Sequence, residues 1–92
     1  MRTAVTRRVR LRVTGRVQGV FFRESLRRRA EGVAGWARNC SDGSLEVILE
    51  GDAADVERVI DFCRIGPDAA RVDDVEVEAE RPEGLTEFEI RP

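Results

Sequence analysis

The chain has 92 residues, 41% hydrophobic and 37% charged, a balance that predicts one globular domain over residues 1–92 and excludes a disordered chain. No apolar run is long enough to cross a bilayer, and the first residues lack the apolar stretch of a secretory signal, so we expect a cytoplasmic protein without a membrane partner. The net charge of −2 divides into +9 for residues 1–38, with eleven Arg and two Glu, and −11 for residues 39–92, with five Arg and sixteen acidic residues.

The chain has no histidine and two cysteines, Cys40 and Cys63. Structural zinc requires four nitrogen or sulfur ligands, so we expect no metal and no cofactor. One disulfide is compatible with the cysteine spacing, which does not require it. Without histidine, any catalysis must depend on the positioning of groups and on electrostatics.

The first predicted element is a strand over residues 8–13, where Arg alternates with aliphatic residues. This period of two predicts a half-buried strand with Val9, Leu11 and Val13 facing the core. Residues 15–19 then indicate a turn.

From Phe22 the apolar residues recur at helical spacing, which predicts a helix with its dipole favoured by Glu24 in the first turn. Gly32 and Gly35 mark its exit. The predicted buried face of this helix consists of Phe22, Leu26, Ala30 and Val33.

A hairpin follows, with a second strand over residues 35–40, a turn at Ser41-Asp42-Gly43 and a third strand over residues 44–50. Alternation along the third strand predicts that Glu46 and Glu50 face away from the core. The residues predicted to face the core are Leu45, Val47 and Leu49.

Asp52 is the predicted cap of a second helix that ends near Gly66. Two strands complete the chain, one over residues 72–79 and a short one over residues 86–91. The apolar stripe of the helix is Val56, Val59, Ile60 and Cys63. The inward residues of the penultimate strand are Val75, Val77 and Ala79, and the last strand centres on Phe88 and Ile90.

This order predicts an α+β, ferredoxin-like βαββαβ sandwich, with two helices on one face of a mainly antiparallel sheet of four to five strands. The first strand exposes Arg, whereas later strands expose Glu, and opposite charges on neighbouring strands attract. We therefore expect the first strand to be central, between acidic neighbours. This also explains the charge asymmetry without a nucleic-acid partner.

Residues 15–23, Gly-Arg-Val-Gln-Gly-Val-Phe-Phe-Arg, join the first predicted strand to the first helix. Such a junction presents free backbone N–H groups and the positive end of a helix dipole, which bind anions. The guanidinium of Arg23 can grip two phosphate oxygens while the loop amides bind the others. The alternative is an ordinary turn followed by a solvated arginine. We expect the side chains of Phe21 and Phe22 to anchor the core.

Residues 35–43, Gly-Trp-Ala-Arg-Asn-Cys-Ser-Asp-Gly, place Asn39 where a strand gives way to a turn. The alternative is that Asn39 is only a turn residue, a role for which Asn is favoured. We expect Trp36 in the core, Arg38 as a solvated charge and Cys40 as a small apolar filler.

Together, Gly15–Arg23 and Gly35-Trp36-x-Arg38-Asn39-x-x-Asp42-Gly43 resemble the acylphosphatase family, and the resemblance extends to residues 88–90. Members of that family hydrolyse the carboxyl–phosphate bond of small acyl phosphates without a metal. The resemblance implies that Arg23 binds phosphate and that Asn39 holds the nucleophilic water. It also implies that loop backbone groups bind phosphate, those of Gln18, Gly19, Val20, Phe21 and Phe22.

The chain departs from the family pattern at two positions. Thr14 stands where many relatives have His or Ser, and Cys40 stands where an apolar residue is usual. Neither position carries the implied chemistry. We therefore expect a monomeric acylphosphatase that acts on a small acyl phosphate without metal, cofactor or nucleic acid.

Three alternatives share this fold. An RNA-binding module fits the Arg-rich first half, but such modules stack bases on exposed aromatics, which the predicted central strands lack. A regulatory effector-binding domain needs a catalytic or DNA-binding partner domain, which we do not expect in this chain. A metallochaperone needs a paired-cysteine motif, and Cys40 and Cys63 are too far apart to form one.

Overall fold

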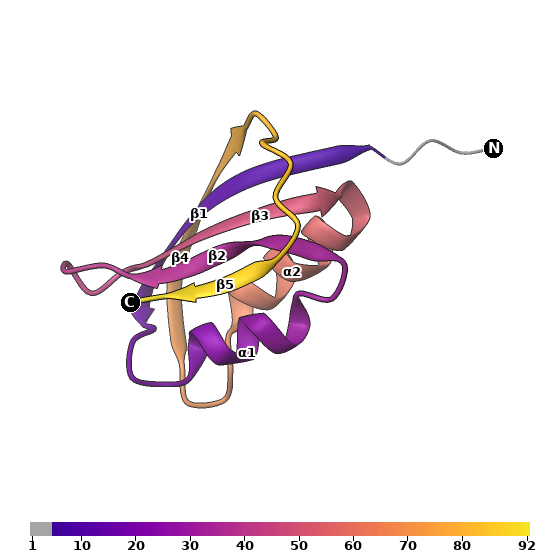
Figure 1. Cartoon of the computed structure of the whole chain (residues 1–92). Coiled ribbons are helices and arrows are strands. Elements are labelled where there is room, and N and C mark those ends of the chain that lie inside the picture. Colours follow the sequence, from indigo (N-terminus) through magenta and orange to yellow (C-terminus); the bar gives the residue numbers. More distant parts are fainter. Residues whose placement is uncertain (1–4) are drawn as a thin grey trace.

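The computed structural model describes residues 5–92. The expectation that the chain lacks a secretory signal concerns its first residues, of which residues 1–4 lie outside the described part. Five strands and two helices follow one another in the order β1-α1-β2-β3-α2-β4-β5 (Figure 1). The strands are β1 (Thr6–Arg16), β2 (Val33–Asn39), β3 (Leu45–Asp52), β4 (Arg71–Glu80) and β5 (Phe88–Arg91). The helices are α1 (Phe22–Arg29) and α2 (Ala53–Ile65).

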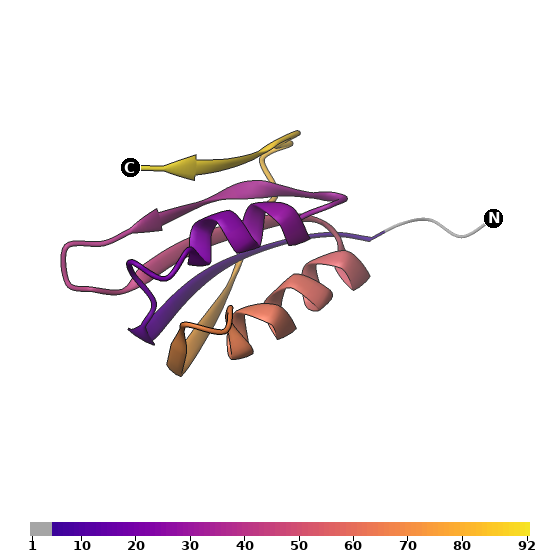
Figure 2. The ribbon, with the colours of Figure 1, turned by 90° about the horizontal axis from the view of Figure 1, so that it is seen from below.

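The strands form one sheet in the order β4-β1-β3-β2-β5, and both helices pack on the same face of it (Figure 2). Three of the four pairings are antiparallel, and the β2–β5 pairing is parallel. This confirms the predicted ferredoxin-like α+β fold. β1 lies between β4 and β3, so the Arg-rich strand has the acidic neighbours that the charge pattern predicted.

The core fills the space between the sheet and the two helices. The predicted inward residues of β1 and β3 are fully buried, and so is the apolar stripe of α2. Phe22 of α1 meets Phe62 of α2 edge to face, with ring centroids 6.0 Å apart. Asp52 caps α2 as predicted, because its carboxylate accepts the N–H of Ala54 at 3.0 Å.

The turn predicted at residues 15–19 begins later than expected. β1 continues to Arg16 through a bulge between Thr14 and Gly15. Gly15 has φ +122°, and a Cβ there would collide with the backbone of Arg71 in β4. The glycine therefore permits a close strand pairing, and the connection to α1 shrinks to residues 17–21.

The first helix is also shorter than predicted. It ends at Arg29, and Gly32, with φ +80°, turns the chain into β2, which begins at Val33. Val33 is buried, but as a strand residue rather than as part of a helical face. A buried residue at helical spacing fits either element, which is why the boundary was misplaced.

Trp36 is not in the core between helices and sheet. It is half-buried on the opposite, open face, where the guanidinium of Arg91 lies 4.5 Å from its ring centroid and that of Arg38 lies 5.7 Å away. Val77 and Ala79 of β4 are exposed instead of buried. β4 is an edge strand with one neighbour, so part of its predicted inner face has nothing packed against it.

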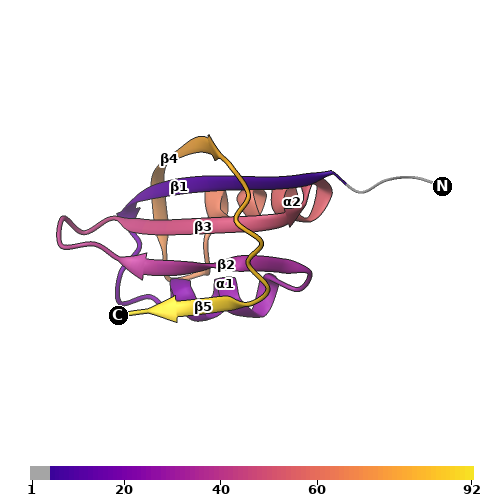
Figure 3. The same cartoon turned by 45° about the horizontal axis from the view of Figure 1, so that its top comes forward.

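The open face is crossed by residues 81–87, which we call the strap (Figure 3). Beneath it, Arg8 and Glu50 are only 5% and 4% exposed and form an ion pair of 3.1 Å. Both were expected to face solvent, and the strap explains why they do not. The Glu50 carboxylate accepts hydrogen bonds of 2.7–2.9 Å from three consecutive strap N–H groups, those of Glu83, Gly84 and Leu85.

Within residues 5–92, no helix has both the length and the apolar character needed to cross a bilayer.

Candidate functional site

The loop between β1 and α1 presents a set of unused backbone donors. In the part of the chain that the structure describes, none of the N–H groups of residues 18–22 donates a hydrogen bond to another protein group. Gly19 and Phe21 have φ of +71° and +60°, so the backbone curls instead of extending. Successive amides in such a curl, at the start of a helix, form a concave site for an anion.

Phe21 occupies a conformation that is unfavourable for its residue type. It precedes α1 in the left-handed region, with no side chain capping the helix, and the residue is 81% exposed. A left-handed residue other than glycine costs roughly 1–2 kcal/mol. Phe22 anchors the core as predicted, but the same prediction for Phe21 is wrong because the curl turns its side chain outward.

Arg23 follows in the first turn of α1. Its Nη1 donates a hydrogen bond of 2.6 Å to the backbone carbonyl of Arg91 in β5. This bond holds the guanidinium at the loop end of the helix, between α1 and the edge of the sheet. The remaining N–H groups of the fork are available to an anion bound by the loop.

Asn39 is the last residue of β2. Its side-chain oxygen Oδ1 is buried and has no hydrogen-bond partner among residues 5–92. A buried acceptor without a partner costs about 1–3 kcal/mol. In native proteins such an atom commonly has a water or a ligand as its partner.

Arg23 and Asn39 line the same cavity, which has a volume of about 460 Å3. The structure therefore brings together the two residues that the sequence singled out. Gly19, Phe21 and Phe22 line it too, whereas Val20 is buried in the core and Gln18 is directed elsewhere. The complete lining is Val17, Gly19, Phe21, Phe22, Arg23, Glu24, Asn39 and Ile90.

Comparison with known proteins shows the family to which the chain is related. A model of the Acylphosphatase family matches residues 9–90. The chain belongs to the acylphosphatase family. The acylphosphatase of Haloarcula marismortui is 53% identical over 81 residues, which cover 86% of this chain and 89% of the relative. That of Gloeobacter violaceus is 52% identical over 92 residues, covering 98% and 97%.

A solved acylphosphatase structure from Coxiella burnetii superposes with a TM-score of 0.89 at 34% sequence identity, covering 94% of this chain and 93% of the other. The chain is therefore an acylphosphatase in both sequence and fold. Acylphosphatases are hydrolases of acyl phosphates.

The Gln18 side chain of this acylphosphatase links the loop to the hairpin between β2 and β3 by two hydrogen bonds, which we call the clip. Its Nε2 donates to the carbonyl oxygens of Cys40 at 2.7 Å and Ser44 at 3.0 Å. Cys40 directly follows Asn39, so this side chain fixes the loop relative to the end of β2. The sequence pointed to the backbone of Gln18 and missed this role of its side chain.

Two further contributors to the site were missed. Ile90 supplies an apolar wall, and Arg91 supplies the carbonyl that holds Arg23. A backbone carbonyl carries no signal in the residue type. The apolar pattern marked Ile90 as a strand residue, and only the parallel pairing of β5 with β2 brings it beside the loop.

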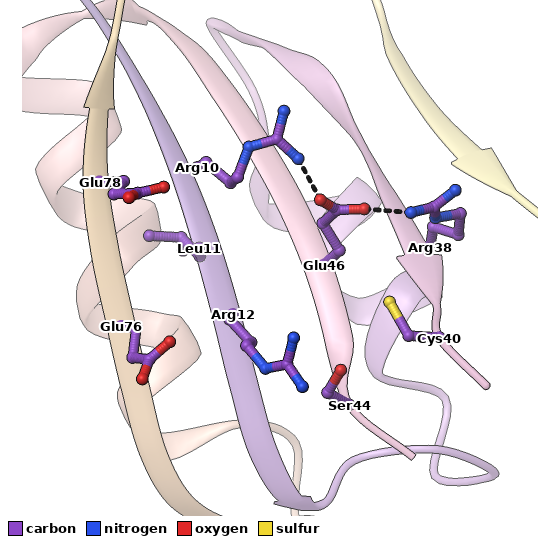
Figure 4. A pocket seen from close by; sticks show the side chains of 9 residues that line it. All are labelled: Arg10, Leu11, Arg12, Arg38, Cys40, Ser44, Glu46, Glu76 and Glu78. Carbon is purple, nitrogen blue, oxygen red and sulfur yellow. Dashed lines mark hydrogen bonds and ion pairs between the residues drawn. The ribbon is translucent and has the colours of Figure 1, made fainter. Parts of the chain in front are cut away.

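A larger cavity, of about 550 Å3, lies on the open face of the sheet (Figure 4). Arg10 and Arg38 both pair with Glu46 there, and Arg12 pairs with Asp42. A hydrogen bond to Glu80 also holds the pKa of Arg10 above its ordinary value. Because these cations are already matched by carboxylates, this cavity offers an anion less than the loop does.

No group of three or more His, Cys, Asp or Glu in residues 5–92 has an arrangement that could hold a metal ion.

Proposed function

We propose that the cavity between the β1–α1 loop and Asn39 is the active site, and that it hydrolyses small acyl phosphates to a carboxylate and inorganic phosphate without a metal ion. One observation carries the proposal. Gly19, Phe21 and Phe22, whose N–H groups are unused, line one cavity together with Arg23 and with Asn39, whose side-chain oxygen has no partner among the described residues.

The phosphate of the substrate binds in the curl of residues 18–22. Its oxygens accept hydrogen bonds from the loop amides and from Arg23, and the start of α1 adds its dipole. In phosphoryl transfer the charge remains on the three equatorial oxygens, so fixed donors around them stabilise the transition state. Because amides and a guanidinium meet the charge of the dianion, the proposed reaction needs no metal.

Asn39 positions the nucleophile. Oδ1 accepts a hydrogen bond from a water molecule. This bond directs a lone pair of the water oxygen toward phosphorus, in line with the leaving carboxylate. The water oxygen forms a new bond to phosphorus while the bond between phosphorus and the acyl oxygen breaks. The electron pair of the broken bond leaves with the carboxylate. A phosphate oxygen accepts the proton, so no histidine is required.

Phosphate release from benzoyl phosphate in EDTA tests this function. The wild type is expected to turn over with EDTA present, and Arg23→Ala and Asn39→Ala are expected to lose most of the rate. Activity that disappears with EDTA and returns with a divalent cation contradicts the metal-independent mechanism. Variants with wild-type activity contradict the site.

We also propose that residues 1–92 form one domain that acts as a monomer in the cytoplasm, with no nucleic-acid or membrane partner. Both outer strands carry charged residues, which oppose edge-to-edge pairing with another copy. Two free thiols fit a reducing compartment. Light scattering should give the mass of a single 10.4 kDa chain, and a gel-shift assay should detect no RNA complex.

A further inference from the structure

Phe21 lowers the stability of the folded protein in two ways. It is the most exposed large hydrophobic residue of the described chain, and its φ of +60° lies in a region that Gly, Asn or Asp adopts more readily. Strained residues of this kind concentrate at functional sites. The phosphate-binding role proposed above needs only the N–H of Phe21 and does not account for the ring.

The ring lies at the opening of the active-site cavity. Phe21 lines that cavity together with Arg23 and Asn39, and its high exposure places the ring on the rim rather than in the interior. An in-line attack by a water at Asn39 expels the carboxylate on the far side of phosphorus. The acyl group therefore extends away from Asn39 and out of the loop, toward the opening.

The cavity is apolar as well as charged. Ile90 of β5 is a half-buried part of its lining, and Val17 lines it from the core, where it is 1% exposed. An aromatic or branched acyl group can be partly removed from water between Ile90 and the Phe21 ring, whereas an acetyl group is too small to cover the ring.

We propose that Phe21 determines acyl-group specificity and that this enzyme favours aromatic and larger apolar acyl phosphates over acetyl phosphate. The proposal rests on the function proposed above, because it places the acyl group by the same in-line geometry. The ring acts on the leaving group and not on the phosphate, so it discriminates between substrates that share the reacting bond.

The test compares kcat/KM for benzoyl phosphate and acetyl phosphate in the wild type, Phe21→Asn and Phe21→Tyr. Asn tolerates the left-handed conformation but removes the ring, and Tyr retains the ring. The ratio of the two kcat/KM values cancels any loss common to both substrates, including one caused by a shifted loop.

We expect Phe21→Asn to lower the benzoyl-to-acetyl ratio about fivefold, within the range measured for single aromatic contacts, and Phe21→Tyr to keep it within about twofold. An unchanged ratio in Phe21→Asn, or an equal fall in Phe21→Tyr, overturns the specificity role while leaving the active site standing. A wild type that hydrolyses neither compound overturns the proposed function itself.

A binding measurement gives an independent readout. Phenylphosphonate and methylphosphonate carry the same anionic group and cannot be hydrolysed at an acyl bond. Phenylphosphonate should inhibit the wild type more strongly, and Phe21→Asn should reduce that preference by about the same factor as it reduces the ratio of kcat/KM. Equal preference in both proteins would show that the ring does not contact the organic group and would overturn the proposal.

Discussion

The guanidinium of Arg23 donates a hydrogen bond of 2.6 Å to the carbonyl oxygen of Arg91, which joins the first turn of α1 to the end of β5. The residue proposed to grip phosphate is thus oriented by the last strand of the chain. β5 is placed in turn by its parallel pairing with β2 and by the strap that leads into it. The site therefore depends on segments that are remote in sequence.

Removal of Arg91 and Pro92 should raise KM for acyl phosphates by about fivefold, because the guanidinium of Arg23 loses the acceptor that orients it. Removal of Pro92 alone leaves Arg91 with a terminal carboxylate whose oxygens can still accept from Arg23, and it is the matched control because both truncated chains end in a carboxylate. Steady-state kinetics with benzoyl phosphate measure both. Equal kinetics for the two truncations would show that this hydrogen bond does not position Arg23.

Asn39→Ala should lower kcat by about a hundredfold while leaving the inhibition constant of inorganic phosphate within about twofold. The substitution removes the group that positions water but none of the phosphate donors. Asn39→Asp keeps an acceptor and adds a negative charge near the dianion, so its KM should rise more than its kcat falls. Full turnover by Asn39→Ala would eliminate the water-positioning role.

Gln18→Glu should destabilise the protein more than Gln18→Ala does, because a carboxylate would face the carbonyl oxygens of Cys40 and Ser44 in place of a donor. We expect Gln18→Ala to lose about 1 kcal/mol of unfolding free energy, and both variants to bind phosphate more weakly. Urea unfolding and phosphate inhibition measure these effects. Arg16→Ala, at an exposed position, is the control, and identical behaviour of all three variants would mean that the clip has no role.

Glu50 should make the stability of the protein depend on pH. Burial on its own raises the pKa of Glu50, but hydrogen bonds from the strap amides and from Arg8 outweigh it and hold the pKa below its ordinary value. A carboxyl whose folded pKa is depressed stabilises the protein above its unfolded pKa of about 4.3, and this contribution is lost as the pH falls through the folded pKa.

The measurement for Glu50 is urea unfolding of the wild type and Glu50→Gln between pH 7 and pH 3. At pH 7 the variant should be less stable by about 2 kcal/mol, because three strap N–H groups lose a charged acceptor and buried Arg8 keeps only Glu80 and Glu83 as carboxylate partners. The difference should shrink as the pH falls below about 4. A difference that stays constant with pH contradicts the ion-paired role of Glu50.

The two cysteines should differ in reactivity. Cys63 is fully buried in α2, and desolvation raises the pKa of its thiol to about 12, whereas Cys40 is half-buried beside the open-face cavity. A thiol reagent at pH 8 should modify Cys40 in the native protein and Cys63 only after unfolding. Two equally fast thiols in the native state would contradict this burial.

The elements of the fold could be predicted where local chemistry decides them. The alternation along β1, the cap at Asp52 and the stripe on α2 each follow from neighbouring residues, and all three are confirmed. The core positions predicted for Trp36 and Val77 and the solvent exposure expected of Glu50 were wrong, because each depends on which face of the sheet is covered. That depends on the strap and on the strand order, which residue spacing does not encode.

The geometry of the candidate site was predictable to a similar extent, and the roles of its residues stay predictions. The motifs singled out Arg23 and Asn39, and the fold brings both to one cavity. The side chain of Phe21 was misplaced because periodicity cannot reveal a left-handed residue at a helix start. The clip made by Gln18 and the carbonyl of Arg91 depend on contacts between distant segments, so no local pattern indicates them.

Titration of the 15N-labelled protein with inorganic phosphate tests the central claim most directly. The amide resonances of residues 18–22 should show the largest saturable shifts, and Arg23→Ala should weaken the apparent affinity by about tenfold or more. Shifts centred on Arg10 and Arg12 of the open-face cavity, or no saturable shift in the loop, would contradict the phosphate-binding role of residues 18–23.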